Sequence, residues 1–161
     1  MPAVGDIHEG YKSTEYVLIV DSQESPGVTK ISGLSEGSYD TIEQPDGGST
    51  HIHKISSTKV KFETLTVERR MDGSHQDKVF QDWWKATFNF ADKVSQGSRV
   101  RKNFRIEKRD NGATVLIFLI TGGWIKSSKF SDLEAGSTNF FTQTVEIEHE
   151  GLERIDATGG A

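Results

Sequence analysis

The sequence predicts a mainly β domain, a β-sandwich or barrel with one flanking α-helix, over all 161 residues. Short runs rich in β-branched and aromatic residues recur along the chain, separated by Gly, Pro, Asn and Asp. One segment alone spaces its apolar residues as an amphipathic helix does. With 34% hydrophobic residues, three Trp and nine Phe, the chain can build one core, so residues 1–161 are predicted to form a single domain.

The first strands are predicted close to the N-terminus. Residues 1–15 precede them and are expected to form an N-terminal arm. The run Tyr16–Asp21 is β-branched and apolar, which predicts a buried strand with Val17 and Ile19 in the core. After a turn containing Ser, Pro and Gly, Val28–Ile31 continues as a second short strand.

A long polar segment follows at residues 35–58. Its first part, SEGSYDTIEQPDGGS, is too polar and too interrupted by Pro and Gly to contribute to a core. We therefore expect a projecting loop or ribbon here.

Two alternating runs, His51–Ile55 and Lys59–Val67, are predicted to form a pair of strands. The second run changes phase near Thr64, and its Phe62 is expected in the core.

One helix is predicted from Gln76 to Asn89. Ser74–Asp77 has the form of an N-terminal capping box, with Asp in place of the usual Glu. Apolar residues then follow at helical spacing, and Phe80, Trp83 and Trp84 are expected to pack against a sheet.

The strongest hairpin signal lies between residues 103 and 120, where Asn111-Gly112 favours a tight turn with positive φ. Gly122 and Gly123 then predict a bend or bulge beside an anchored, buried Trp124. A polar crossover at residues 126–136 leads to a last strand at residues 140–148.

The C-terminal run TVEIEHEGLERI, residues 144–155, alternates like a half-buried strand. Val145 and Ile147, with His149, fall on its apolar side. The opposite, charged side carries Glu146, Glu148 and Glu150. A zinc-protease helix needs a second His four residues after the first, whereas position 153 is Glu. Residues 155–161 are expected to form a flexible tail.

Charge is distributed unevenly along the chain. Residues 1–68 carry 5 basic and 11 acidic groups, residues 69–130 carry 13 and 6, and residues 131–161 carry 1 and 7, which sums to −5. The basic middle segment could indicate nucleic-acid binding, but its Arg and Lys residues are dispersed over a strand pattern, which favours a solvated face or a partner for the acidic ends. The absence of cysteine excludes a disulfide framework or a thiolate site and points to no compartment. With no signal-peptide pattern and no apolar run long enough to span a membrane, we expect assembly in the cytoplasm.

No catalytic motif is recognisable, so an enzyme is not expected and no cofactor is assigned. His51 and His53 share one strand face and could in principle hold a metal ion, but cross-strand polar packing is the simpler interpretation. The acidic clusters lack the ligand spacing of a calcium loop, so no metal site is assigned.

A chain with many strands and one helix must protect its sheet edges, either with charges or by pairing with neighbouring subunits. A terminal strand with one charged and one apolar face suits the wall of a barrel built from several subunits.

The sequence closely resembles the tail tube protein family, which forms the inner tube of contractile phage tails and of related extracellular injection systems. The resemblance extends from Tyr16 to Arg154, and its most specific part is EIEHEGLER. The segments that carry it are Tyr16–Asp21, Ile31–Leu34, Gly47-Gly48 before His53-Lys54, Thr64–Arg69, Gly123-Trp124 and Thr144–Arg154.

The resemblance implies a tail-tube fold whose subunits form hexameric rings stacked into a tube inside a contractile sheath. It also implies baseplate and tail terminator proteins as partners, transient passage of DNA or protein cargo, and a place in the phage virion. Residues 35–58 would contact the next ring, with Tyr39, Pro45, Asp46, Gly47, Gly48, His51 and His53 as candidate contacts. We predict a phage tail tube subunit whose lumen conducts DNA.

Three alternatives stay open at this point. They are the inner tube of an extracellular injection system delivering protein effectors, a secreted tube protein of the type VI kind, and a monomeric β-barrel that binds a ligand. The row Glu146, Glu148 and Glu150 would face either the lumen or a basic segment of a neighbour. If it is lumenal, six chains of −5 each, −30 in all, would repel passing DNA.

Overall fold

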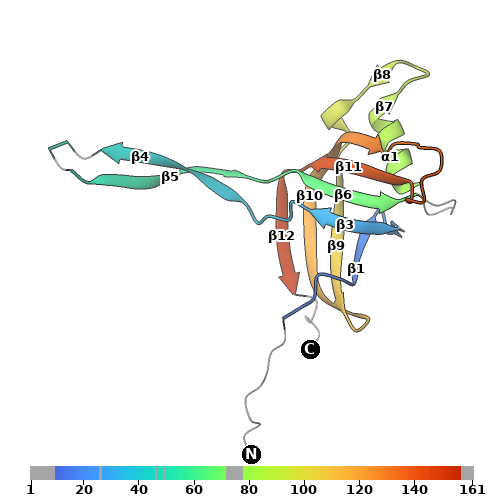
Figure 1. Cartoon of the computed structure of the whole chain (residues 1–161). Helices are drawn as coiled ribbons and strands as arrows, with labels where there is room; N and C mark the ends of the chain where they lie inside the picture. Colours follow the sequence, from blue (N-terminus) through green and yellow to red (C-terminus); the bar gives the residue numbers. More distant parts are fainter. Residues whose placement is uncertain (1–9, 26, 46, 49, 72–77, 157–161) are drawn as a thin grey trace, which may run out of the picture.

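One long bent strand, β10 (Ala113–Phe130), connects two antiparallel sheets (Figure 1). Its first half pairs with β9 (Lys102–Asp110) on one side and with β12 (Gly151–Asp156) on the other. Its second half pairs with β11 (Thr142–Glu148). We call the layer β2-β1-β9-β10-β12 sheet A and the layer β10-β11-β6-β3 sheet B.

This computed structural model describes residues 10–25, 27–45, 47–48, 50–71 and 78–156. The remaining elements are β1 (Tyr16–Val20), β2 (Gln23–Glu24), β3 (Val28–Ser32), β4 (Ser38–Pro45), β5 (Ile52–Lys61), β6 (Leu65–Arg70), β7 (Phe88–Asn89), β8 (Val94–Ser95), α1 (Val79–Thr87) and a short 3-10 helix (Gly97–Arg99). The predicted class, mainly β with one flanking helix, is confirmed for the described residues.

Two glycines allow β10 to leave sheet A and enter sheet B. The pairing register shifts between Ile120 and Gly123, and Gly122 has φ +67°. A Cβ on Gly123 would lie 2.8 Å from the Phe104 ring, so the sheets approach closely only because that side chain is absent. The predicted bend is therefore present, and the adjoining Trp124 is half-buried.

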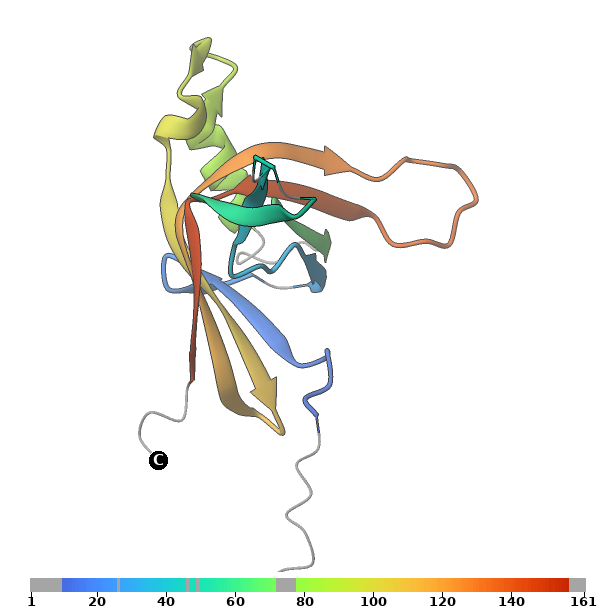
Figure 2. The ribbon, with the colours of Figure 1, turned by 90° about the vertical axis from the view of Figure 1, so that its left-hand side faces the viewer.

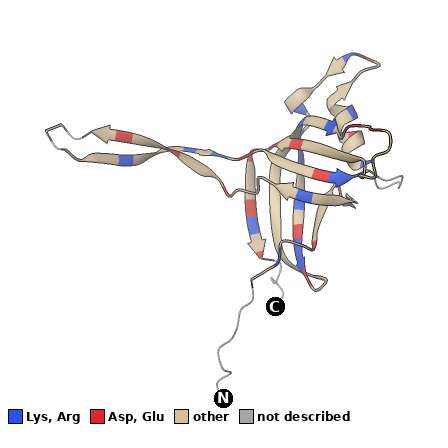
Figure 3. Ribbon diagram, viewed as in Figure 1, with Lys and Arg blue, Asp and Glu red and all other residues tan. Residues whose placement is uncertain are grey.

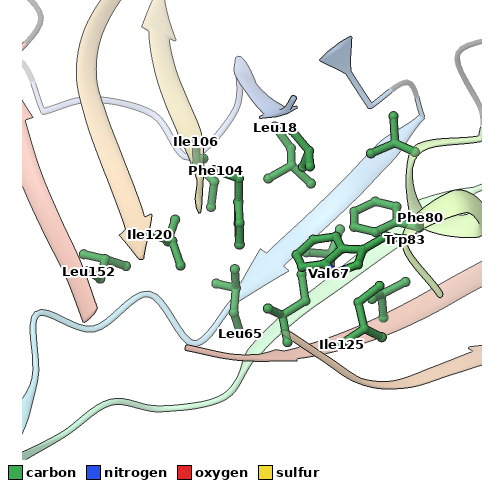
Figure 4. Close-up of a cluster of buried hydrophobic side chains, with 14 residues drawn as sticks. Leu18, Leu65, Val67, Phe80, Trp83, Phe104, Ile106, Ile120, Ile125 and Leu152 are labelled. Carbon is green, nitrogen blue, oxygen red and sulfur yellow. The ribbon is translucent and has the colours of Figure 1, made fainter. Parts of the chain in front are cut away.

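The core lies between the two sheets and under α1 (Figure 4). The core faces of the sheets contribute aliphatic side chains, and α1 adds Phe80 and Trp83, whose rings stack with centroids 6.4 Å apart. Of the residues expected in the core, the buried ones are Ile19, Phe80, Trp83, Val145 and Ile147, and the half-buried ones are Val17, Phe62, Trp84 and Trp124.

Helix α1 is shorter than predicted. It begins at Val79, and it ends because Phe88 adopts an extended conformation with φ −140° and starts β7. The predicted capping box, residues 74–77, lies outside the described residues.

The strands β4 and β5 form a two-stranded ribbon that extends away from both sheets (Figure 1). The predicted pairing of His51–Ile55 with Lys59–Val67 is wrong, because both runs up to Lys61 belong to the single strand β5. Thr58, with φ +64°, absorbs a phase change inside β5, and alternation alone does not distinguish such a strand from a hairpin. The following strand, β6, pairs instead with β11 and β3.

The C-terminal run is two strands, not one. β11 ends at Glu148, the chain turns at His149 and Glu150, and β12 then pairs with β10 in sheet A. The Glu150 amide donates a hydrogen bond to the Thr121 carbonyl at 2.9 Å and fixes this corner. Ile155, expected in a flexible tail, pairs with Ile117 near the end of β12.

Candidate assembly surfaces

The outer face of sheet B is a polar surface, which we call the polar wall. Directly opposed residues of neighbouring strands share one face of a sheet. Lys129, Thr144, Glu68 and Lys30 form one such row across β10, β11, β6 and β3. The charged members of the polar wall are Lys30, Glu68, Arg70, Lys126, Lys129, Glu146 and Glu148.

Two of the three carboxylates predicted to share a face do so. Glu146 and Glu148 lie on the polar wall, where Glu148 accepts a hydrogen bond from Thr64 and lies 3.5 Å from the Lys126 ammonium. Glu150 lies elsewhere because β11 ends before it, and it forms an ion pair with Arg101 at 2.8 Å. The expected row of three carboxylates is therefore wrong, and Glu148 finds a basic partner within its own chain.

Basic side chains of residues 69–130 form ion pairs with carboxylates of both acidic segments, residues 1–68 and 131–161. Lys102 contacts Asp21, and Arg109 lies 3.5 Å from Glu24. Figure 3 shows blue and red segments interleaved along the strands. Pairs as exposed as these contribute little stability. They nevertheless favour the interpretation of the basic segment as a partner for the acidic ends over a nucleic-acid track.

Sheet B has two open edges among the described residues. β3 pairs with β6 alone, and residues 124–130 of β10 pair with β11 alone. Each edge presents unpaired backbone N–H and C=O groups, which makes it a template for another strand. All pairings within sheet B are antiparallel, so its two outermost strands run in opposite directions.

The ribbon is exposed along almost all of its length. The ion pair between Lys61 and Asp40, at 2.5 Å, links its two strands near the base. Ile42 faces Ile55 across the ribbon, and both side chains are exposed. An isolated two-stranded hairpin is only marginally stable in water, so this shape is typical of a segment that binds a second surface.

The predicted ring-to-ring residues gather on the ribbon. Tyr39 lies opposite Val60 near the base, and Pro45 lies opposite Ile52 where β4 ends. Gly47 lies in the turn beyond Pro45.

The other candidates lie at the same end. Gly48 belongs to the tip, and His53 pairs with Gln44. The rings of His51 and His53 meet edge to face with centroids 4.8 Å apart. Asp46 lies outside the described residues.

In the part of the chain that the structure describes, no three His, Cys, Asp or Glu side chains gather to hold a metal ion. Nor does that part contain a helix with the length and apolar character needed to cross a bilayer. His149 is buried at the β11–β12 corner against Phe62, with ring centroids 5.5 Å apart, and burial lowers the pKa of its imidazole.

Sequence reasoning missed a buried arginine. Arg69 lies on the core face of β6, where Nη1 donates to Gln143 Oε1 at 2.9 Å and the guanidinium lies 5.9 Å from the Phe80 ring centroid. Its place in the alternation after Leu65 and Val67 could have indicated this orientation.

The family model of the T4-like virus tail tube protein gp19 matches residues 12–153. The chain belongs to this tail tube family. It is therefore a structural tail tube subunit, of a phage tail or of a contractile injection system. Family membership disfavours both an enzyme and a monomeric ligand-binding barrel.

Solved structures with the same fold support this assignment. A chain of the PVC extracellular contractile injection system, solved as an extended sheath-tube complex, matches with a TM-score of 0.76 and 16% identity, covering 94% of this chain and 95% of that one. A chain of the anti-feeding prophage tube-terminating cap gives 0.76 and 16%, with 94% of each chain covered. Hcp1 from Flavobacterium johnsoniae gives 0.51 and 19%, covering 89% of this chain and 99% of that one. No curated protein sequence matches this tail tube subunit significantly.

Proposed function

We propose that this chain forms the inner tail tube of a contractile phage tail, as hexameric rings that stack and conduct DNA through their lumen. The observation that carries the proposal is sheet B, which has four antiparallel strands, two open edges and a polar outer face. An even number of alternating strands lets β3 of one copy meet β10 of the next in antiparallel orientation. Six copies would then close one barrel of 6 × 4 = 24 strands.

In this arrangement the polar wall lines the lumen, with sheet A and α1 as the outer layer. The polar wall carries four basic and three acidic side chains per copy, so the total of −30 per ring does not describe it. Opposite charges alternate along its rows, as in Lys129, Thr144, Glu68 and Lys30. A bore of this kind offers phosphates no continuous basic track, so DNA would slide through it without being held.

The ribbon would connect successive rings. It lies between β3 and β6 in the chain, and its exposed apolar pair Ile42 and Ile55 is left uncovered by the described residues. Sheets A and B should stay folded without the ribbon tip, because the described residues between 40 and 48 contribute no side chain to the buried core. Deletion of residues 40–49 should therefore give rings that do not stack, and tubes of normal length from that variant would reject the ring-to-ring role.

A second candidate keeps the tube and changes the cargo. One of the two matches with TM-scores of 0.76 comes from an extracellular contractile injection system, which supports a tube that delivers protein effectors. Solved neighbours include a sheath-tube complex, a tube terminator and a baseplate, so the corresponding proteins are the expected partners here.

Negative-stain electron microscopy of the purified chain tests the tube. Six-fold rings or rods are expected, and a monomer at every concentration would refute the proposal. The nucleic acid content of intact, nuclease-washed particles then separates the two cargoes. Protected DNA supports the phage tail, and its absence together with enclosed protein supports the injection system.

A further inference from the structure

A cavity of about 560 Å³ opens under strand β3, between β3 and the core face of sheet A. The strands β9 and β10 of sheet A continue past β3 towards the end of the sandwich where β12 ends (Figure 1). Part of the apolar inner surface of sheet A is therefore not covered by sheet B. The cavity is lined by apolar side chains, chiefly Ile31, Leu34, Ile106, Leu116 and Phe118. A cavity of roughly 150 Å³ holds one benzene ring, so this one has room for more than one aromatic side chain.

A partly exposed aromatic pair lies at the opposite edge of sheet B. Phe130 ends β10, Phe141 precedes β11, and their rings stack with centroids 5.7 Å apart and an interplanar angle of 10°. Phe130 pairs with the buried Gln143, so both rings lie on the core face of the sheet. They nevertheless lie beyond the core and are 56% and 37% exposed. The hairpin that carries them extends past the other strands of its sheet (Figure 2).

Pairing of the two open edges would bring these features together. If β3 of one copy accepts β10 of the next, the two strands join one sheet and their core faces point the same way. The core face of β3 carries Ile31, which lines the cavity. The strand added beside it would therefore present Phe130 over the uncovered part of the cavity.

The charges around the two features are complementary. Two lysines, Lys12 and Lys108, line the cavity, and Lys30 of the polar wall borders it from the edge strand β3. The loop that joins Phe130 to Phe141 carries Asp132 and Glu134 and no basic residue. Opposite charges of this kind fix the register of an interface and disfavour wrong partners.

We infer that the cavity under β3 receives the Phe130–Phe141 pair of the adjacent copy, so that each subunit completes the hydrophobic core of its neighbour. This inference rests on the proposed ring and names the surface that closes it. The cavity and the aromatic pair lie at opposite edges of one chain, so each copy offers one of each.

Photo-crosslinking locates the aromatic pair in the assembled ring. Benzoylphenylalanine placed at Phe130 should, on irradiation, give a covalent ladder whose adducts map to the peptides around Ile31 and Leu116. The same residue at Phe90, which is 82% exposed on the β7–β8 hairpin, is the matched control and should not label the cavity. If rings assemble but the adducts from position 130 map to other peptides, the inference is wrong and the proposed tube function still stands. A wild-type chain that forms no rings would instead remove the proposed function, and this inference with it.

A larger side chain in the cavity wall tests the same contact while Phe130 and Phe141 stay unchanged. Leu116→Trp should keep the single chain folded, by circular dichroism, while raising the concentration for half-assembly by about tenfold or more. Leu119→Trp, on the opposite face of the same strand, should leave the cavity open. Normal assembly of Leu116→Trp would refute the contact. So would a small amphiphile that copurifies with the wild-type protein and is lost from this variant while the tubes stay unchanged.

A charge exchange gives a second, reversible readout. Lys12→Glu with Lys108→Glu should weaken assembly, and so should Asp132→Lys with Glu134→Lys. All four changes in one chain should restore assembly toward the wild-type level. Additive losses, with no restoration in the combined variant, would contradict the pairing of loop and cavity.

Discussion

The replacement Ile147→Ala provides a direct test of which face of β11 is buried. Ile147 is fully buried and pairs with Ile125 on β10 and with Leu65 on β6, both of which are also buried. Its side chain is therefore enclosed on both sides within sheet B. The outward neighbour Glu146 belongs to the polar wall and provides a control on the same strand.

The magnitude follows from the side chain that is removed. Truncating a buried Ile to Ala costs about 2–5 kcal/mol, because transfer free energy is lost and the remaining cavity collapses only in part. For a chain of this size each kcal/mol lowers the Tm by roughly 2–4 °C, so the Tm should fall by about 4–20 °C. Glu146→Ala should change the free energy of unfolding by about 0.5 kcal/mol or less.

Urea unfolding followed by circular dichroism checks both values on the single chain, at a protein concentration below that at which rings form. Assembly would otherwise add its own stabilisation to the measured free energy. Equal and small effects of the two replacements would refute the face assignment, and with it the placement of Glu146 on the polar wall.

Three further outcomes are expected. Gly33→Ala should destabilise strongly, since Gly33 has φ +86° and a Cβ would lie 2.1 Å from the Thr64 carbonyl oxygen. The control Gly112→Ala, which also has positive φ but open space around it, should cost only the backbone penalty of about 1 kcal/mol. Thermal melts of the two variants compare the losses in Tm. Val145→Asp should give insoluble or unfolded chain in a solubility assay, because a buried unpaired carboxylate costs several kcal/mol. Burial lowers the pKa of His149 below its value in the unfolded chain, so the unfolded state takes up the proton first as the pH falls. The free energy of unfolding should therefore decrease as the pH drops below about 6.5. His149→Phe should flatten this part of a plot of urea midpoint against pH, and an unchanged slope would contradict the role of His149.

Local patterns in the sequence predicted the elements whose formation depends on nearby residues. Asn111 and Gly112 both adopt positive φ in the turn between β9 and β10, as an Asn-Gly hairpin requires. The aromatic spacing of α1 placed Phe80 and Trp83 in the core. Turn geometry and helical periodicity are properties of a few adjacent residues, which is why a single sequence reveals them.

Strand partners were not predictable in the same way. The alternation of residues 52–61 is equally compatible with one strand containing a distortion at Thr58 and with two strands. Glu150 continues the alternation of Glu146 and Glu148, although the chain has already turned away from sheet B before it. Alternation reports which side chains share a face, while the partner and the end of a strand depend on contacts with distant segments.

The candidate assembly surfaces also include parts that local sequence patterns predict and parts that they do not. The ribbon could be located from its polar, Gly- and Pro-containing composition, and two carboxylates of the polar wall from their alternation. The open edges, the cavity under β3 and the exposure of Phe130 depend on how far each sheet extends, which no local pattern encodes.

The offset between the two sheets gives self-association a direction. One edge of sheet B carries the cavity under β3, and the other carries the Phe130–Phe141 pair. A two-fold dimer through β3 alone would join two cavities and leave both aromatic pairs exposed, and a dimer through β10 would do the reverse. Only head-to-tail contacts satisfy both edges of every copy, and contacts of this type either close into rings or continue as open filaments. If the core faces stay on one side of the growing sheet, curvature toward the polar wall would close it, and the proposed hollow ring is the product that would leave no edge of sheet B unpaired.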